Sequence, residues 1–493
     1  MASAPSPPAP PAPAPGLLVA VTGEPDAGKT RLLAELAAWH GTRHERTEGF
    51  VAVAGQRGEP GEGADEYRLQ LLATGEELAW AVRDEARSPP YRFAAAAVAR
   101  LERWANALPA RSPLVVLDEF SRFEARGEGL MPLWPAIVAA RPRIVVVAVR
   151  SGLEAAIEER LGRRFDLRID AARPDALARL QGACADYGEW TRIGLFGGAA
   201  GGIETTVGTA LHVAKVPLRG LALASLQGAM MTFTGFGLSR PSRVVWVPFI
   251  SAGLKALSPG GSRLRPMLAI SAQGALYGAA VQIAGWNFVG VALGGALVGA
   301  WAALQGFALQ YLVLGGEMVK AYDAVLLWLA GRWHVSAPGL PWLVGAWALL
   351  HALVAGSVAL AAWRLRAPPK RLRDLIERES RRAPAATGGA ASRPPRRRRP
   401  LRDLGRWQFW LPLLMVGGIM LTTGRPLESV AWLVLRFLAV SVVLLALVSL
   451  VRPARWADGL RRRGFWGPAL ALADAIDRRE GDTGRSRLGP TEG

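Results

Sequence analysis

Hydrophobic positions follow two different patterns along this chain of 493 residues. In the first third, short apolar runs alternate with stretches whose apolar residues recur every three or four positions. Short runs are typical of buried strands, and periodic stretches are typical of helices that cover a sheet. Residues 16–185 are therefore predicted to form an α/β domain with a parallel sheet and flanking helices. Strands are expected at 17–22, 67–72, 113–117, 144–149 and 165–169, and helices at 29–38, 93–105 and 153–161.

Long apolar stretches replace this alternation after residue 190. Several approach the roughly 20 residues that a helix needs to cross a bilayer. The pattern predicts an all-α, multi-span membrane domain over 190–363 and a two-span hairpin over 407–451. Buried helices of a soluble domain are the alternative, which so many consecutive runs disfavour. Spans are expected near 194–213, 219–238, 243–257, 266–285, 288–314, 341–363, 407–423 and 428–451.

Three segments lack a pattern that could bury a core. Residues 1–15 are a Pro/Ala tail without the features of a secretory signal, so we expect the N-terminus in the cytoplasm. Residues 364–406 form a basic linker interrupted by Pro and Gly, and residues 452–493 form a basic tail. Because Lys and Arg concentrate on the cytoplasmic side of spans, both segments are expected in the cytoplasm, with the protein in a bacterial inner membrane.

The number of spans follows from the same charges. The N-terminal domain and the linker 364–406 share one side only if an even number of spans separates them, and six spans satisfy this condition. Four spans with two re-entrant stretches are the alternative. It is favoured by the basic residues that six spans would place on the far side, Lys215, Arg219, Lys255, Arg263 and Arg265.

Composition narrows the function classes. The chain has a net charge of +19, and its basic residues are concentrated beside apolar runs, where membrane topology explains them. Membrane lipid is therefore the expected partner, and no nucleic-acid partner is expected. The single cysteine, Cys184, excludes an internal disulfide and clusters of cysteine ligands. The five histidines show no ligand spacing, so a metal would have to arrive with a nucleotide.

Residues 23–30 read GEPDAGKT, which matches the phosphate-loop pattern G-x-x-x-x-G-K-[ST] between a predicted strand and a predicted helix. The glycines let backbone N–H groups converge on phosphates, Lys29 reaches the β and γ positions, and the Thr30 hydroxyl can bind Mg²⁺. The predicted nucleotide-binding residues are Gly23, Glu24, Pro25, Asp26, Ala27, Gly28, Lys29 and Thr30.

A second motif, PLVVLDEF at 113–120, is an apolar strand that ends in two carboxylates. Asp118 is placed to hold Mg²⁺ through water, and Glu119 to orient or deprotonate an attacking water. A solvated acidic loop is the alternative. Together the motifs predict hydrolysis or transfer of the γ-phosphate of ATP or another NTP, with Lys29, Asp118 and Glu119 as catalytic residues and Thr30 and Asp118 as Mg²⁺ ligands.

The segments GEPDAGKT, GFVAVAGQRG, EYRLQLLATGEELAWA and LDEFSRFEA resemble the thermophile-type nucleoside-triphosphatases, also called cancer-related nucleoside-triphosphatases. The resemblance covers about a third of the chain and implies slow, Mg²⁺-dependent hydrolysis of several NTPs. Asp118, Glu119 and Glu124 fall on that family's carboxylates, with Ser121 and Arg122 as departures. Glu124 is expected to cap the following helix or to pair with Arg122. Residues 57–66 depart from the family's pattern, which leaves the base contacts open.

Polar residues interrupt the predicted spans. A carboxylate or carboxamide is costly against lipid and is expected to face a cavity or another polar group. Glu204, Gln273, Gln282 and Asn287 are the candidate cavity residues, with Gln305 and Gln310 later in the chain. For Glu204, a role in substrate binding and an interior hydrogen bond remain equally open. Glycine and alanine in the same runs are typical of ordinary helix packing.

The six predicted spans are rich in small residues and contain polar ones, and in this they resemble the substrate-capture subunits of energy-coupling-factor vitamin transporters. The last hairpin resembles the end of the coupling subunit of those transporters. This implies a small-molecule transport substrate and ABC-type ATPase partners, which Ala454 and Arg455 would contact. No ABC signature sequence is found in the N-terminal domain.

Three functions remain open at this point: an NTPase fused to an uptake domain, a membrane-anchored NTPase without transport, and an NTP-dependent regulatory switch. Polar residues in the spans favour the first function over the second. The charged segment FSRFEARGEGLMPLW, after the acidic strand, is a candidate switch region for the third.

Overall fold

The structure, a computed structural model, divides into two compact units. Unit 1 comprises Met1–Gly188 with Arg461–Gly467, and unit 2 comprises Glu189–Leu460 with Pro468–Gly493. The structure describes residues 16–42, 46–53, 66–83, 91–214, 218–255, 264–333, 339–381, 407–422, 426–449 and 453–485. Among the predicted features, the tail 1–15, most of segment 57–66 and residues 382–406 of the basic linker lie outside these residues.

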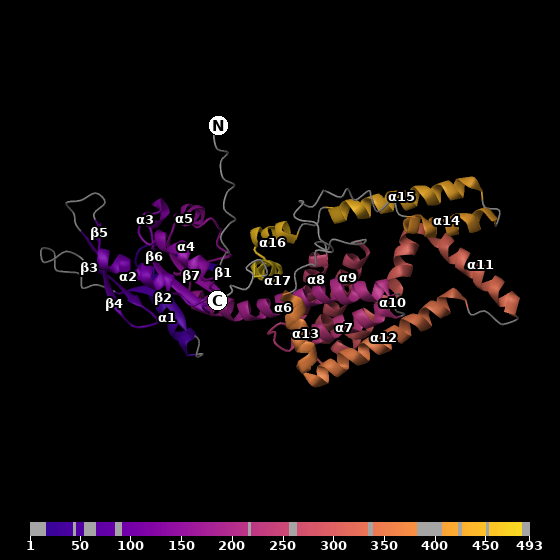
Figure 1. Cartoon of the computed structure of the whole chain (residues 1–493), viewed down its shortest axis with the longest axis horizontal. Helices are drawn as coiled ribbons and strands as arrows, with labels where there is room; N and C mark the ends of the chain where they lie inside the picture. The colour runs from indigo at the N-terminus through magenta and orange to yellow at the C-terminus, as the bar shows by residue number, and fades with distance from the viewer. Residues whose placement is uncertain are drawn as a thin grey trace, which may run out of the picture. The chain divides into compact units, whose positions relative to one another are not determined.

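Unit 1 is built on an eight-stranded sheet in the order β5-β4-β3-β2-β6-β7-β1-β8 (Figure 1). The central strands are almost purely apolar, which suits parallel strands covered on both faces. The strands are β1 (Leu17–Gly23), β2 (Thr47–Val53), β3 (Glu66–Leu71), β4 (Glu77–Arg83), β5 (Tyr91–Phe93), β6 (Leu114–Phe120), β7 (Ile144–Arg150) and β8 (Leu167–Asp170).

The sheet is mostly but not wholly parallel. β2, β6, β7, β1 and β8 run parallel, so the predicted α/β fold is confirmed at this level. The prediction of a purely parallel sheet is wrong at one edge, where β3, β4 and β5 extend the sheet as antiparallel strands. Residues 72–76 suffice to join β3 to β4, because antiparallel neighbours allow such a short connection whereas parallel strands need a crossover.

Helices cover both faces of this sheet. Alternate residues of β1, β6 and β7 enter two apolar clusters, as the two-residue period of a strand requires. One cluster packs against α2, α4 and α5, and the other against α1 and the start of α6. The helices of unit 1 are α1 (Lys29–Gly41), α2 (Ala95–Asn106), α3 (Arg122–Arg126), α4 (Trp134–Ala139) and α5 (Glu154–Leu161), with a 3₁₀ turn at Met131–Leu133; α6 (Ala176–Val213) continues into unit 2.

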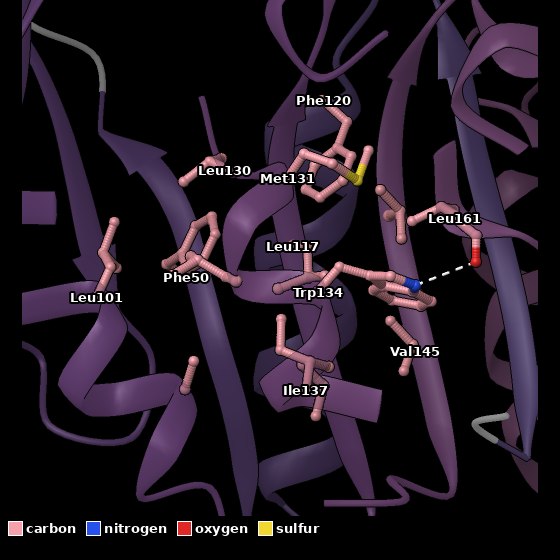
Figure 2. Packing of buried hydrophobic residues seen from close by; sticks show 14 of the residues in the cluster. Phe50, Leu101, Leu117, Phe120, Leu130, Met131, Trp134, Ile137, Val145 and Leu161 are labelled. Atoms are coloured by element: carbon pink, nitrogen blue, oxygen red, sulfur yellow. Dashed lines mark hydrogen bonds between the residues drawn. The ribbon is translucent and has the colours of Figure 1, made fainter. Parts of the chain in front are cut away.

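Trp134 shows how the first cluster is fixed. Figure 2 shows its ring beside Leu117 of β6 and Val145 of β7. Its Nε1–H donates to the carbonyl oxygen of Leu161 at 3.2 Å, so the buried indole keeps a hydrogen bond. The ring therefore ties α4 both to the sheet and to the end of α5.

A segment far along the chain completes unit 1. Nε of Arg461 lies 3.1 Å from Oδ1 of the buried Asp166, which precedes β8. Trp466 packs against the second apolar cluster, which includes Ile169 and Leu180. Residues 461–467, expected in a separate basic tail, thus contribute to the packing of the N-terminal unit.

Unit 2 is helical throughout its described residues (Figure 1). Besides the end of α6, it contains a 3₁₀ turn at Pro241–Val245 and the helices α7 (Arg219–Gly235), α8 (Trp246–Lys255), α9 (Leu264–Ala284), α10 (Phe288–Leu314), α11 (Gly316–Trp333), α12 (Leu340–Leu365), α13 (Lys370–Arg381), α14 (Trp407–Thr422), α15 (Leu427–Ser449), α16 (Pro453–Arg462) and α17 (Trp466–Arg485). The end of α16 and the start of α17 lie within the 461–467 segment, which belongs to unit 1.

Within the described residues, three helices are long and apolar enough to cross a membrane, Pro266–Ala284, Phe288–Leu312 and Leu340–Leu365. They correspond to three of the predicted spans. The span expected near 243–257 contains α8, whose 10 residues extend only about 15 Å, half of a bilayer core. α11, α13, α16 and α17 were not expected as helices, and α13 lies inside the predicted linker.

The small residues of α6 serve helix packing. Gly202 of this helix lies against α13, where an added Cβ would overlap the backbone of Glu379. The Thr206 hydroxyl donates to Oε2 of Glu379 at 3.2 Å, and this carboxylate is almost wholly buried. A charged, amphipathic helix therefore covers a stretch that the sequence suggests as a lipid-facing span.

Candidate functional site

Residues 23–30 form the connection between β1 and α1 at the carboxyl edge of the sheet. Asp26 and Gly28 adopt left-handed backbone conformations with φ of 62° and 83°. The amide of Ala27 donates to the carbonyl oxygen of Glu24 at 3.2 Å, which closes a turn. α1 begins after Gly28 without a side-chain cap and without an acidic residue in its first turn. Its first N–H groups are therefore left to donate to an anion.

Lys29 contacts the loop that it follows. Its Nζ donates to the carbonyl oxygens of Gly23 at 2.9 Å and Glu24 at 2.6 Å. The ammonium group therefore lies inside the curve of the loop, close to where phosphate oxygens would lie. Glu24, Pro25 and Asp26 are exposed around it.

The two carboxylates of β6 lie in a bulge. The pairing of β6 with β7 shifts register between Leu117 and Phe120, and Glu119 has a left-handed φ of 67°. In a regular strand Asp118 and Glu119 would point to opposite faces of the sheet. The bulge and the strained backbone at Glu119 instead bring both carboxylates near Lys29, and such strain is concentrated at functional sites.

Asp118 is held by the strands around it. Only 1% of the residue is exposed. Its Oδ2 accepts from the amide of Ala52 in β2 at 3.1 Å, and its Oδ1 accepts from the amide of Glu119 at 2.9 Å. Burial raises the pKa of Asp118, while these amides, the Thr30 hydroxyl and the charge of Lys29 act in the opposite direction. Thr30, Lys29 and Asp118 thus meet at one point.

Glu119 reaches solvent, yet protein surrounds much of its carboxyl group. This partial loss of hydration, together with repulsion from Asp118 and Glu124, raises the pKa of Glu119 to about 7, although Lys29 acts against the shift. A carboxylate whose pKa lies near neutral pH is suited to accept a proton from water.

The raised pKa of Glu119 predicts a pH-dependent stability. Folding raises the pKa from 4.5 to about 7, so the stabilising effect of the proton is fully present below pH 4.5 and is lost as the pH rises towards 7. The variant Glu119→Gln has no ionisable group at this position. Its β6 amides are therefore expected to be better protected from hydrogen exchange than those of the wild type at pH 8, and by a smaller margin at pH 5. Hydrogen exchange without nucleotide, compared between variant and wild type at each pH, measures this. An equal margin at both pH values contradicts it.

Glu124 has a structural role. Its Oε2 accepts from the amide of Ser121 at 2.7 Å, and its Oε1 accepts from the amide of Leu130 at 2.9 Å. Ser121 and Glu124 form a capping box at the start of α3. The expectation that Glu124 caps the following helix is therefore confirmed.

Two neighbours of the loop were not anticipated from the sequence. The amide of Ser151, just after β7, donates to the carbonyl oxygen of Gly23 at 3.2 Å. The amide of Ala171, just after β8, donates to the carbonyl oxygen of Thr22 at 2.8 Å. Both contacts depend on the strand order, because they require β7 and β8 to lie on either side of β1, and the sequence carries no signal for that order.

The donor set fits Mg²⁺ bound with a nucleotide. Asp118 and Thr30 supply a carboxylate and a hydroxyl oxygen, which are hard ligands of the kind that Mg²⁺ prefers. No group of three or more His, Cys, Asp or Glu in the described part of the chain could hold a metal ion by itself. Phosphate oxygens would therefore complete the coordination.

Unit 2 contains a second candidate site, a cavity of about 1010 Å³ bounded by α6, α7, α9, α10 and α12. Glu204 and Gln273, two of the predicted cavity residues, line it together with Gln305. Gln227, Arg219 and His351, which the sequence did not single out, line it as well.

The other two predicted cavity residues lie elsewhere. Gln282 is exposed near the end of α9. Asn287 caps α10, because its Oδ1 accepts from the amide of Gly290 at 2.9 Å. Neither residue lines the cavity. The prediction failed for these two residues because a helix that is apolar on all sides carries no sequence signal for the face that turns inward.

Unit 1 is thus an α/β unit with a mostly parallel sheet, in which a glycine-rich loop, a lysine and two carboxylates meet at the carboxyl edge. Residues 18–163, which contain all of these groups, match a family described as "Protein of unknown function (DUF2478)". No curated protein and no solved structure matches the chain.

Proposed function

We propose that unit 1 is a P-loop domain that hydrolyses nucleoside triphosphates with Mg²⁺. The observation that carries the proposal is the meeting of loop 23–30 with Asp118 and Glu119, two segments about ninety residues apart in the chain. A phosphate-binding loop alone would support binding. The added carboxylate pair supports hydrolysis.

Each residue has a role in this proposal. The amides of the loop and of the first turn of α1 bind the phosphates, and Lys29 exchanges its bonds to Gly23 and Glu24 for phosphate oxygens. Thr30 and Asp118 hold Mg²⁺, which would supply positive charge to the leaving phosphates. Glu119 orients the attacking water and accepts its proton. The resemblance to the thermophile-type nucleoside-triphosphatases implies slow turnover with loose base selectivity.

We propose further that unit 2 lies in the inner membrane of a bacterium and that unit 1 faces the cytoplasm. Phe236, Trp286 and Trp363 cluster at one end of α7, α9 and α12, with ring centroids 4.9 to 5.6 Å apart. Exposed Arg364 and Arg366 follow directly. Aromatic clusters followed by arginine are typical of the cytoplasmic membrane interface.

Uptake of a small molecule is the second candidate function of the chain. The cavity in unit 2 favours it over a merely anchored NTPase, because a membrane anchor needs no polar cavity. In this proposal either the NTPase acts on a nucleotide-linked product of the imported molecule, or separate ABC-type ATPase subunits are partners of the chain. The regulatory switch, with segment 120–134 as its moving part, remains the alternative for unit 1.

Asp118→Asn tests the hydrolysis proposal. The change keeps the shape of the side chain but removes the charge that would hold Mg²⁺, so phosphate release should fall at least about a hundredfold. Release is measured on the full chain in detergent with ATP, GTP, CTP and UTP, with and without a chelator. Asp175→Asn, at an exposed aspartate paired with Arg173, is the matched control and should leave the rate unchanged. A folded wild type that neither binds nor hydrolyses any of the four refutes the proposal.

A further inference from the structure

Arg150 ends β7 directly beside the phosphate loop. In the parallel pairing of β1 with β7, Arg150 is the partner of Gly23, the first residue of the loop. The next amide, that of Ser151, donates to the carbonyl oxygen of Gly23 at 3.2 Å. Nζ of Lys29 donates to the same oxygen at 2.9 Å. The end of β7 and the ammonium group of Lys29 therefore meet on one backbone atom of the loop.

The two-residue period of β7 directs the Arg150 side chain to the face of the sheet that α1 covers. Val146 and Ala148, the alternate residues before it, belong to the apolar cluster that packs against α1. On the next strand, the carboxylate of Asp118 accepts from the hydroxyl of Thr30 in the first turn of α1. Arg150 and Asp118 thus leave the sheet on the side where α1 begins.

The guanidinium of Arg150 is free to donate. Arg150 is partly exposed, and within the described residues its side chain forms no hydrogen bond or ion pair. Two arginines of the following elements, Arg160 and Arg168, instead bond to the carbonyl oxygen of Ala125 and the carboxylate of Glu158. A guanidinium presents its N–H groups in a planar fork that matches the oxygens of a phosphate. The fork of Arg150 is unoccupied beside a loop that suits phosphates.

The loop needs a second cation if it is to hold a triphosphate. Asp118 and Glu119 lie near Lys29, and Glu24 and Asp26 are exposed on the loop. A triphosphate would add more negative charge to this acidic surrounding than Mg²⁺ and Lys29 neutralise. A further cation at the γ-phosphate would stabilise the charge that its oxygens carry in the transition state.

Arg150 has to turn towards the loop when a nucleotide binds. In the structure the charge of Lys29 acts against the rise in the pKa of Glu119, whereas Arg150 has no part in that pKa, so its guanidinium lies away from this carboxylate. The turn breaks no contact of the side chain. The backbone can stay in place, because the amide of Leu153 donates to the carbonyl oxygen of Arg150 at 3.1 Å and closes the turn after β7.

We propose that Arg150 is a catalytic residue, which binds the γ-phosphate of the nucleoside triphosphate and neutralises charge on its oxygens in the transition state. In hydrolysis the oxygen of water bonds to the γ phosphorus, and the bond from this phosphorus to the bridging oxygen breaks. The electron pair of that bond leaves with the diphosphate, and the proton of the water passes to Glu119. Arg150 transfers no proton and only donates hydrogen bonds. The proposal rests on the proposed hydrolysis by unit 1.

Rates of phosphate release test the catalytic role on the full chain in detergent. Arg150→Ala is expected to lower release about a hundredfold at saturating Mg²⁺ and NTP. Arg150→Lys keeps the charge without the fork and should recover part of the rate. Arg143→Ala is the matched control, because Arg143 is an exposed arginine that directly precedes β7 at the opposite edge of the sheet. Equal rates in Arg150→Ala and Arg143→Ala overturn the proposal.

Binding of nucleotide analogues tests the contact without hydrolysis. ADP has no γ-phosphate, whereas AMP-PNP carries one that is not released. Arg150→Ala should bind AMP-PNP with Mg²⁺ at least about tenfold more weakly than the wild type does, and ADP with Mg²⁺ equally well. Isothermal titration calorimetry measures both affinities. A folding defect would weaken both analogues, so an equal change for the two, or no change for either, overturns the proposal.

Failure of the proposed function gives a different pattern. If the wild type hydrolyses NTPs and Arg150→Ala does so at the same rate, the proposed function stands and the role of Arg150 is wrong. If the wild type releases no phosphate, hydrolysis fails as the function and Arg150 is not catalytic. Selective loss of AMP-PNP affinity in Arg150→Ala would then assign this arginine to recognition of the γ-phosphate alone.

Discussion

Lys29→Ala is expected to lower NTP hydrolysis by about 10²–10³-fold, because the side chain is the cation placed to meet the β and γ phosphates. The substitution also removes the bonds from Nζ to the carbonyl oxygens of Gly23 and Glu24, which are 2.9 and 2.6 Å long. Those bonds are internal to the loop, so their loss should have little effect on folding. Phosphate release at saturating Mg²⁺ and NTP measures the effect.

The control for this substitution lies two residues further along the same helix. Arg31 carries a similar charge, but its side chain is 84% exposed and pairs with Glu35 within α1. Arg31→Ala should retain nearly full hydrolysis. Equal losses in the two variants would mean that general positive charge near the loop matters, and the role assigned to Lys29 would be wrong.

Gly49→Ala is expected to destabilise unit 1 by at least about 3 kcal/mol. Gly49 lies in β2 with a left-handed φ of 107°, and a Cβ there would overlap the carbonyl oxygen of Val116 in β6. β2 and β6 would have to move apart, and the hydrogen bond from the amide of Ala52 to Asp118 joins these same two strands. Hydrolysis should therefore fall together with stability. Proteolysis of the full chain in increasing urea, followed through peptides of β2, measures the loss.

A substitution at Gly75 separates the cost of the left-handed backbone from the cost of the overlap with Val116. Gly75 also has a left-handed φ, of 73°, but an added Cβ would meet nothing within 4 Å. Gly75→Ala should cost only the backbone strain, about 1–2 kcal/mol. If Gly49→Ala costs no more than Gly75→Ala, the close approach of β2 to β6 is not a constraint.

The sequence predicted the loop and the strands β1, β3, β6, β7 and β8, but it did not predict β2, β4 or β5. β1 and β7 are continuous apolar runs, which buried parallel strands require, and both were found. β4 mixes exposed and buried positions because it lies near the edge, so its pattern did not stand out from a loop. β5, with 3 residues, is too short to show any period.

The site was predictable as far as chemistry follows from residue type. The loop motif and the carboxylate pair predicted which residues meet. The bulge that turns Asp118 and Glu119 towards Lys29 was not predictable, because nothing in LVVLDEF encodes a left-handed residue. The contact from Ala52 depends on β2 lying beside β6, which is a matter of strand order. Gln227 was missed although it interrupts a predicted span as Gln273 does, so the same signal could have found it.

The 461–467 segment ties the folding of unit 1 to the order of synthesis. A ribosome releases β1 to β8 early, but Arg461 and Trp466, which contact Asp166 and the second apolar cluster, emerge only after nearly all of unit 2 has been made. Since domains generally fold as they are synthesised, the nascent N-terminal unit must wait with part of its surface uncovered while the helices of unit 2 are synthesised. Synthesis of segment 461–467, rather than completion of the sheet, is then the step that allows this unit to acquire its final packing.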